Sequence, residues 1–173
     1  MNHKLSACVP LLALLGAGCN PVVADLVELS VADGGTVDVD TICDDPCLGD
    51  EVSVEGTFEE HIAIDVEATV ELLQYKVEYA FDAVDPAPDY FSDTISVTLT
   101  SGQTTTFTID LAAASQREQV DEAMDGELAT GTATVTFAGY DHRDELIELP
   151  VQVPIIFGRY DSTESDTSDE VTQ

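Results

Sequence analysis

GELATGTATVTFAG, residues 126–139, alternates between two kinds of side chain. Ala133, Val135 and Phe137 share one parity, and threonines fill the other parity from Thr130 to Thr136. Successive side chains of a β-strand point to opposite faces of the sheet, so this pattern predicts a strand with one buried face and one wet face. Half-buried strands of this kind are typical of antiparallel sheets.

The same period of two recurs along the chain. In LQYKVEYAF, residues 73–81, the odd-numbered positions from Tyr75 to Phe81 are apolar or aromatic. Residues 94–111 contain two alternating runs that are broken at Ser101-Gly102, which predicts a hairpin. Shorter alternating runs predict further strands at 26–31, 36–42, 51–55 and 61–72.

The last apolar run is the longest. Every odd-numbered position from Ile147 to Phe157 is apolar, and Pro150 and Pro154 both fall on the opposite parity. Proline has no N–H to donate to a neighbouring strand, so the two prolines predict an edge strand or a bulged one. Prolines at an edge also discourage association with the edge of another sheet.

A single short helix is predicted before residue 126. Ser115 and Glu118 have the spacing of a capping box, and Gly126 is a suitable stop. We expect this helix to cross between two sheets. Many short strands and one helix over residues 25–160 predict an all-β, immunoglobulin-like antiparallel β-sandwich of eight or nine strands. The chain contains no Trp, so the Cys…Trp…Cys hallmark of true immunoglobulin domains is missing and the likeness is one of architecture.

Both ends of the chain differ from this domain. Residues 161–173, DSTESDTSDEVTQ, contain one apolar residue and are predicted to form a disordered acidic tail. Residues 1–18 have a short polar start with Lys4, an uncharged apolar run over 7–15 and small residues after it. That layout predicts a secretory signal peptide, because a bilayer-spanning helix needs about 20 apolar residues.

Small residues followed directly by Cys19 resemble the lipobox of bacterial lipoproteins. In that family the cysteine sulfur receives a diacylglyceryl group, the preceding peptide is removed, and the new amino terminus is acylated, with palmitate as the expected chain. The resemblance implies that Cys19 is lipidated and that residues 19–24 form a lipidated tether. The chain departs from the family at Gly16, where leucine is usual.

The resemblance also implies a location. Asn20 is not the Asp that favours inner-membrane retention in well-studied lipoproteins, so an outer-membrane anchor is expected. The alternative is ordinary secretion, since Val22-Val23-Ala24 suits a conventional signal peptidase.

Two cysteines remain in the domain. Cys43 and Cys47 in CDDPC are close enough in sequence to close a small disulfide loop in an oxidising compartment. A zinc site that uses these two cysteines with His61 and His142 is the alternative.

The chain is strongly acidic, with 35 Asp and Glu against five Lys and Arg and a formal net charge of −30. Such a field repels nucleic acid and anionic membrane faces. Acids spread along the whole chain favour adaptation to salty water, as in halophilic proteins, over a local site. Calcium is the alternative: Asp44, Asp45, Asp50 and Glu51 lie in one loop that the disulfide would pin.

The sequence holds no recognisable catalytic motif. His61 and His142 are isolated in sequence, and the turn histidine His142 lies beside Asp141 and Asp144. In the loop 82–93, Tyr90-Phe91 is either a partner-binding tip or a plug at the end of the sandwich.

The sequence therefore predicts a non-enzymatic, lipid-anchored, acidic protein of the cell envelope. Its predicted role is structural or an interaction with an envelope protein or glycan, without a cofactor. The alternative is a secreted, calcium-dependent adhesion or ligand-binding module.

Overall fold

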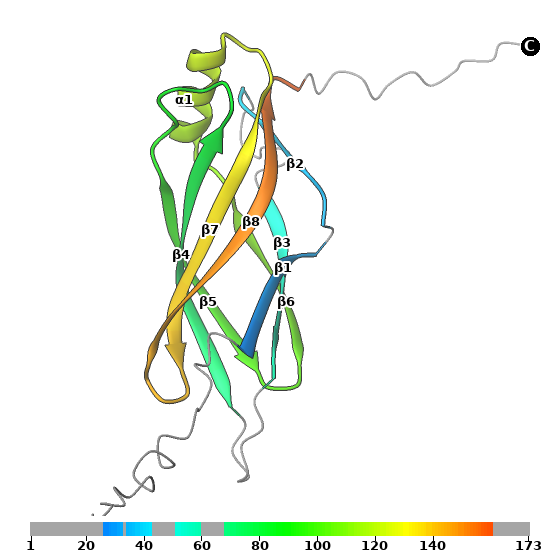
Figure 1. Cartoon of the computed structure of the whole chain (residues 1–173), viewed down its shortest axis with the longest axis vertical. Coiled ribbons are helices and arrows are strands. Elements are labelled where there is room, and N and C mark those ends of the chain that lie inside the picture. Colours follow the sequence, from blue (N-terminus) through cyan, green and yellow to red (C-terminus); the bar gives the residue numbers. More distant parts are fainter. Residues whose placement is uncertain (1–25, 33, 43–50, 60–67, 161–173) are drawn as a thin grey trace, which may run out of the picture.

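A computed structural model of the chain describes residues 26–32, 34–42, 51–59 and 68–160. Across these residues the chain forms eight strands and one helix (Figure 1). The elements are β1 (Val27–Val31), β2 (Val37–Asp40), β3 (Glu51–Phe58), β4 (Thr69–Phe81), β5 (Phe91–Thr100), β6 (Thr104–Asp110), α1 (Ala114–Met124), β7 (Ala129–Asp141) and β8 (Leu146–Gly158).

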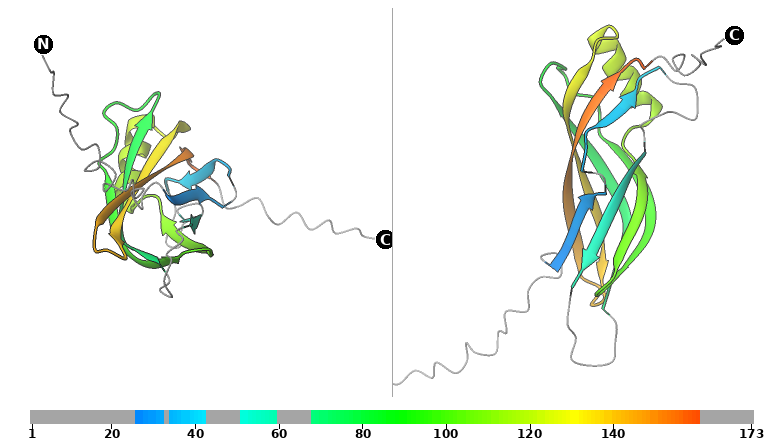
Figure 2. Two further views of the ribbon diagram at one scale, coloured as in Figure 1. Left: turned by 60° about the horizontal axis from the view of Figure 1, so that its bottom comes forward. Right: turned by 90° about the vertical axis from the view of Figure 1, so that its right-hand side faces the viewer.

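The strands form two sheets, as the sequence predicts for an all-β sandwich. One sheet has three strands in the order β1-β3-β6, and the other has five in the order β2-β8-β7-β4-β5. Consecutive strands often change sheet: β1 lies beside β3, whereas β2 lies beside β8 (Figure 2). The helix α1 joins β6 of the three-stranded sheet to β7 of the five-stranded sheet, which confirms the expected crossing.

The predicted hairpin over residues 94–111 is wrong. Its two runs become β5 and β6, but β5 pairs with β4 and β6 pairs with β3, in different sheets. At the turn between them, the Gly102 N–H donates to the Phe58 carbonyl and the Ser101 N–H to the Ala68 carbonyl. Alternation could not reveal this, because facing strands of a sandwich bury alternate residues just as paired strands of one sheet do.

The last strand is an edge over most of its length. Among the described residues, β8 pairs with β7 along Leu146–Phe157 but with β2 only along Ile155–Gly158. Pro150 and Pro154 fall in the part with a strand on one side only, which is the kind of strand in which prolines are tolerated. The β2–β8 pair is parallel, so the sandwich is not purely antiparallel as predicted.

A bulge explains why β4 reads as two runs in the sequence. The register shifts between Leu72 and Gln74, so the buried parity changes from Val70 and Leu72 to Tyr75 and Val77. The strand predicted at 61–72 is therefore continuous with the next one from residue 69 on, and its residues 61–67 lie outside the described part.

The helix begins earlier than predicted. Its N-cap is Ala113, whose carbonyl accepts from the Gln116 N–H at 3.1 Å, while the Gln116 side-chain oxygen accepts from the Ala113 N–H at 3.3 Å. The predicted Ser115–Glu118 box is thus wrong, because the polar group that caps the helix is a buried glutamine. The helix ends at Asp125 in a left-handed conformation, one residue before Gly126.

Side chains from both sheets form one core, which includes the fully buried Phe58, Phe137 and Phe157. Two tyrosines of β4 bond across the sandwich: Tyr79 donates to the Leu111 carbonyl at 2.6 Å, and the Tyr75 hydroxyl accepts from the Asp110 N–H at 3.2 Å. Burial raises the pKa of Tyr75 to about 12.

The sandwich has two distinct ends. One end, the helix pole, carries α1 and the end of β8, where the described chain finishes at Tyr160 (Figure 1). The other end, the turn pole, carries Leu26, the turn at 101–102 and the turn at 142–145. The described domain thus begins and finishes at opposite poles.

Candidate functional site

Most of the site residues predicted from the sequence lie outside the described residues: Cys19, Cys43, Asp44, Asp45, Cys47, Asp50 and His61. Their predicted lipidation, disulfide and ligand roles stay predictions. Glu51 is described and is exposed as the first residue of β3, directly opposite Asp110 of β6.

Glu51 lies in an acidic groove at the open edges of β5 and β6. This groove, of about 230 Å³, is also lined by Asp93 and Asp110, with Tyr75 at its base. Within the ranges that the structure describes, no three His, Cys, Asp or Glu side chains are close enough together to hold a metal ion.

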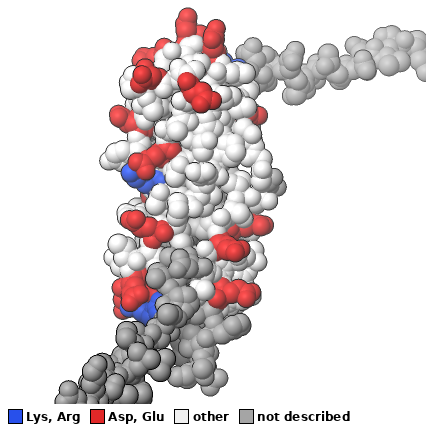
Figure 3. Space-filling model, viewed as in Figure 1, with Lys and Arg blue, Asp and Glu red and all other residues white. Residues whose placement is uncertain are grey.

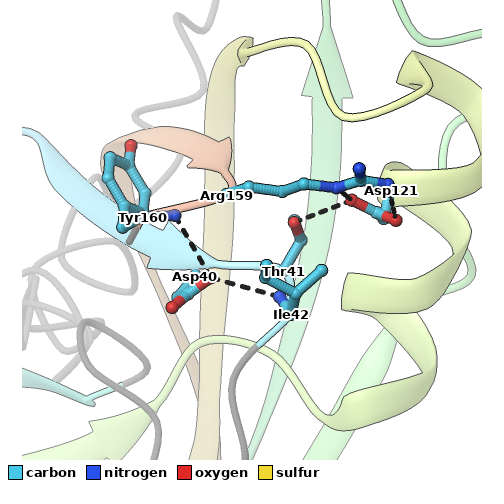
Figure 4. A network of polar contacts seen from close by, with 6 residues as sticks. All are labelled: Asp40, Thr41, Ile42, Asp121, Arg159 and Tyr160. Carbon is cyan, nitrogen blue, oxygen red and sulfur yellow. Dashed lines mark hydrogen bonds and ion pairs between the residues drawn. The ribbon is translucent and has the colours of Figure 1, made fainter. Parts of the chain in front are cut away.

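A network at the helix pole joins three segments that are distant in sequence (Figure 4). The Arg159 guanidinium, just after β8, donates two hydrogen bonds of 2.7 Å to Asp121 of α1. The Thr41 hydroxyl donates to the same carboxylate at 3.0 Å, and its N–H donates to the Gly158 carbonyl. The hydrogen bond from Arg159 is the main reason why the pKa of Asp121 lies below its usual value.

Asp40 completes this network at the end of β2. Its side-chain oxygen accepts from the Ile42 N–H at 3.1 Å and from the Tyr160 N–H at 3.4 Å. Ile42 directly precedes residues 43–50, so the network fixes the position from which the predicted calcium loop departs. The network holds α1, β2 and the end of β8 together.

The turn at 142–145 is organised by the buried carboxylate of Asp141. His142, the histidine considered in the sequence analysis, does not organise it. One Asp141 oxygen accepts from the N–H groups of Arg143 at 2.8 Å and Glu145 at 2.9 Å, and the other accepts from Arg143 Nε at 2.9 Å. Burial alone would raise the pKa of Asp141, but these hydrogen bonds hold it below its usual value.

The predicted Tyr90-Phe91 pair divides between its two proposed roles. Phe91 begins β5 and packs edge-on against Tyr75, with ring centroids 6.0 Å apart, so it is the plug. Tyr90 is 62% exposed, and the Lys76 ammonium lies 5.3 Å from the centre of its ring.

A hollow lies on the outer face of the five-stranded sheet. It measures about 400 Å³ and is lined mainly by polar side chains of β4, β5, β7 and β8, including Gln74, Lys76, Thr136 and Glu148. Lys76 and Glu78 form an ion pair of 2.7 Å at its side. No pattern in the sequence predicts this hollow, because its residues come together only through strand pairing.

A second, smaller hollow of about 180 Å³ adjoins the first and shares Gln74 and Ala138 with it. It is lined by three exposed apolar side chains near the turn pole, Leu73, Tyr140 and Leu146. We call the two hollows together the outer groove. It is the candidate interaction site.

Comparisons with known proteins add little to this geometry. No known family and no curated protein matches the chain. Among solved structures, the chain is similar to a protein from Archaeoglobus fulgidus, at 16% identity and a TM-score of 0.34, over 78% of this chain and 95% of the other. A likeness this distant says nothing about activity. The described part of the chain contains no helix long and apolar enough to cross a membrane.

Proposed function

We propose that this protein is a lipid-anchored, acidic β-sandwich of a bacterial cell envelope. It acts there as a non-enzymatic interaction module. The lipobox-like cysteine at position 19 supports the anchor. The observation that carries the proposal is the placement of the chain ends: the described domain begins at the turn pole and finishes at the helix pole.

This placement sets an orientation for a tethered domain. The predicted tether, residues 19–24, spans at most about 21 Å when fully extended, at roughly 3.5 Å per residue. The turn pole is then held near the membrane, and the helix pole, with α1 and the network around Asp121, points away from it. The outer groove runs along the side of the domain and stays accessible to a partner.

We propose further that the sandwich is immunoglobulin-like. If β1 and β2 are two halves of the first strand, A, then β3, β4, β6, β7 and β8 correspond to B, C, E, F and G. The sheets read A-B-E and G-F-C, which are the groupings of immunoglobulin domains. Strand β5 follows C and lies beside it, which is the place of strand C′ in variable-type immunoglobulin domains.

The acidic surface fits a protein that works in salty water. Acids along the chain stay hydrated there, and dissolved ions screen their mutual repulsion. Screening would also let an acidic domain approach an anionic envelope, which it would avoid at low salt.

The test of the anchor is the intact mass of the mature protein from the membrane and soluble fractions of a bacterial host. We expect a membrane species that begins at Cys19 and carries a diacylglyceryl group and an acyl chain. A mass lower by two hydrogens would also report the Cys43–Cys47 disulfide. The Cys19→Ser variant is the control and should leave the membrane fraction. An unlipidated species that begins at Asp25 would refute the anchor.

The second candidate is the calcium-dependent adhesion or ligand-binding module. The observation in its favour is the acidic groove, where Asp93 and Asp110 lie beside Glu51 at the end of the predicted calcium loop. In this case Ca²⁺ would bridge the loop to the groove, and ligand binding would depend on it.

A further inference from the structure

Charge is unevenly distributed over this protein. The outward positions of β7 are Thr130, Thr132, Thr134, Thr136, Ala138 and Tyr140, and none of them is charged. The outward positions of β8 from Leu146 to Ile156 include one charged residue, Glu148. We call these two rows the neutral face. Figure 3 shows it as a largely uncharged band, with acids at its margins and at the helix pole.

A neutral face is unexpected in a chain with 35 acids. Acidic side chains hold water at the surface. A partner can therefore approach an uncharged region without displacing water that is bound to charged groups. The outer groove lies along this face, at the border between β7 and β4. One side of the outer groove is therefore formed by the neutral face, and the other side carries the Lys76–Glu78 ion pair.

The groove offers hydrogen bonds along its floor and aromatic rings at its ends. Gln74, Ser92, Thr136 and Glu148 provide amide, hydroxyl and carboxylate groups. Tyr140, 45% exposed, lines one end, and Tyr90 lies beyond Lys76 at the other. Thr136 to Tyr140 covers four residues of strand, about 13 Å at 3.3 Å per residue, so the groove suits an extended ligand.

We propose that the outer groove binds an uncharged oligosaccharide. Sugar hydroxyls both donate and accept, which suits a floor of amide, hydroxyl and carboxylate groups. The apolar face of a sugar ring can stack on an exposed tyrosine, which offers a flat apolar surface and a polar tip. An anionic glycan is disfavoured by Glu78, Glu148 and the overall negative charge.

Two other occupants fit less well. An apolar peptide or helix would leave the polar floor unpaired, because the exposed apolar side chains gather at one end, at Leu73, Tyr140 and Leu146. A second copy of the chain would bring together two molecules of the same high negative charge. Binding of a second copy is one outcome of the test.

The inference rests on the proposed interaction role but not on the lipid anchor. The test therefore uses the secreted full chain with Cys19→Ser, labelled with ¹⁵N, in high salt. The probes are cellohexaose, maltohexaose and chitohexaose, with oligogalacturonate as the anionic comparison. We expect at least one neutral hexaose to shift the amide signals of residues 74–76 and 136–140, with a dissociation constant of about 1 mM or tighter.

Three tyrosine variants locate the binding. Tyr90→Ala and Tyr140→Ala should each weaken it by roughly fivefold or more, the loss typical of truncating an interface anchor. Tyr160→Ala, at the helix pole, is the matched control and should bind as before. Gln74→Ala gives a test within the floor if a tyrosine variant fails to fold, which its circular dichroism would show.

Four results would overturn the proposal. The first is the absence of shifts with all three neutral hexaoses. The second is equal binding of oligogalacturonate, and the third is equal weakening by Tyr160→Ala. The fourth is a concentration-dependent dimer that buries the same amides, which would assign the groove to a second copy. None of these results bears on the anchor, which the intact mass tests separately.

Discussion

Replacing Asp141 by alanine should destabilise the domain by about 2–4 kcal/mol, although the residue lies in a surface turn. Its side chain is 0% exposed and accepts three hydrogen bonds, two of them from the backbone N–H groups of Arg143 and Glu145. The variant leaves these two donors without their acceptor and breaks the ion pair with Arg143.

The magnitude follows from the number of bonds and their exposure. A hydrogen bond to a charged group contributes about 1.5–3 kcal/mol, and we count about 1–1.5 kcal/mol, no more than the lower end of that range, for each of the two backbone bonds, because water can reach the turn. The ion pair adds at most about 1 kcal/mol, because the Arg143 side chain is 30% exposed. The expected fall in melting temperature is about 5–15 °C for a domain of this size.

Urea unfolding measures this difference in stability. It is followed by circular dichroism, because the chain has no Trp whose fluorescence could report unfolding. Asp141→Asn keeps a carbonyl acceptor for the two N–H groups and should lose about half as much stability as the alanine variant. Asp144→Asn is the matched control: it removes a charge from the same turn, and asparagine tolerates the left-handed conformation of residue 144.

The pH dependence gives a second check. The pKa of Asp141 is lowered on folding, so its contribution is present above the unfolded value of about 3.8 and is lost as pH falls through the folded value. The gap between wild type and Asp141→Ala should therefore close in acid. A gap below about 0.5 kcal/mol at neutral pH, the usual range for surface substitutions, would refute the reasoning.

Three further predictions concern the core, the sheet and calcium. Tyr79→Phe should lower the free energy of unfolding in urea by about 1–3 kcal/mol, because the buried Leu111 carbonyl loses its donor. Burial raises the pKa of Tyr79, so the stability difference between wild type and variant should persist up to pH 10 and shrink at higher pH. Gly139→Ala should cost about 3 kcal/mol in the same assay, because the added carbon would meet the Glu71 backbone carbonyl, which cannot move aside; a loss under 1 kcal/mol would contradict this. If the loop 43–50 binds calcium, micromolar to millimolar Ca²⁺ should raise the melting temperature more than NaCl of matched ionic strength, whereas equal stabilisation by both salts would support the salt-adapted surface.

Alternation in the sequence predicted well which side chains are buried. Tyr75, Val77 and Tyr79 all point into the core, and so does every odd-numbered residue from Ile147 to Phe157. This works because burial on one face of a strand is a local property with a period of two. The same signal cannot assign a strand to a sheet, which is why the runs on either side of Ser101-Gly102 were predicted as a hairpin.

The candidate site could not be predicted from the sequence. Gln74, Ala138 and Glu148 adjoin in the groove because β4 pairs with β7 and β7 with β8 at one register. That register depends on contacts between distant parts of the chain: Gln74 and its partner Ala138, for example, are 138 − 74 = 64 positions apart. The residues that the sequence did single out, around Cys43 and Cys47, lie outside the described part of the chain.

The parallel pairing of β2 with β8 has a mechanical consequence. These strands come from near the two ends of the domain, and they run side by side in the same direction over Val37–Asp40 and Ile155–Gly158. A force that pulls the two ends apart along the strands loads this short ladder in shear, so its hydrogen bonds share the load instead of opening one after another. If the protein is anchored at one end and held by a partner at the other, this pair would help to resist the tension.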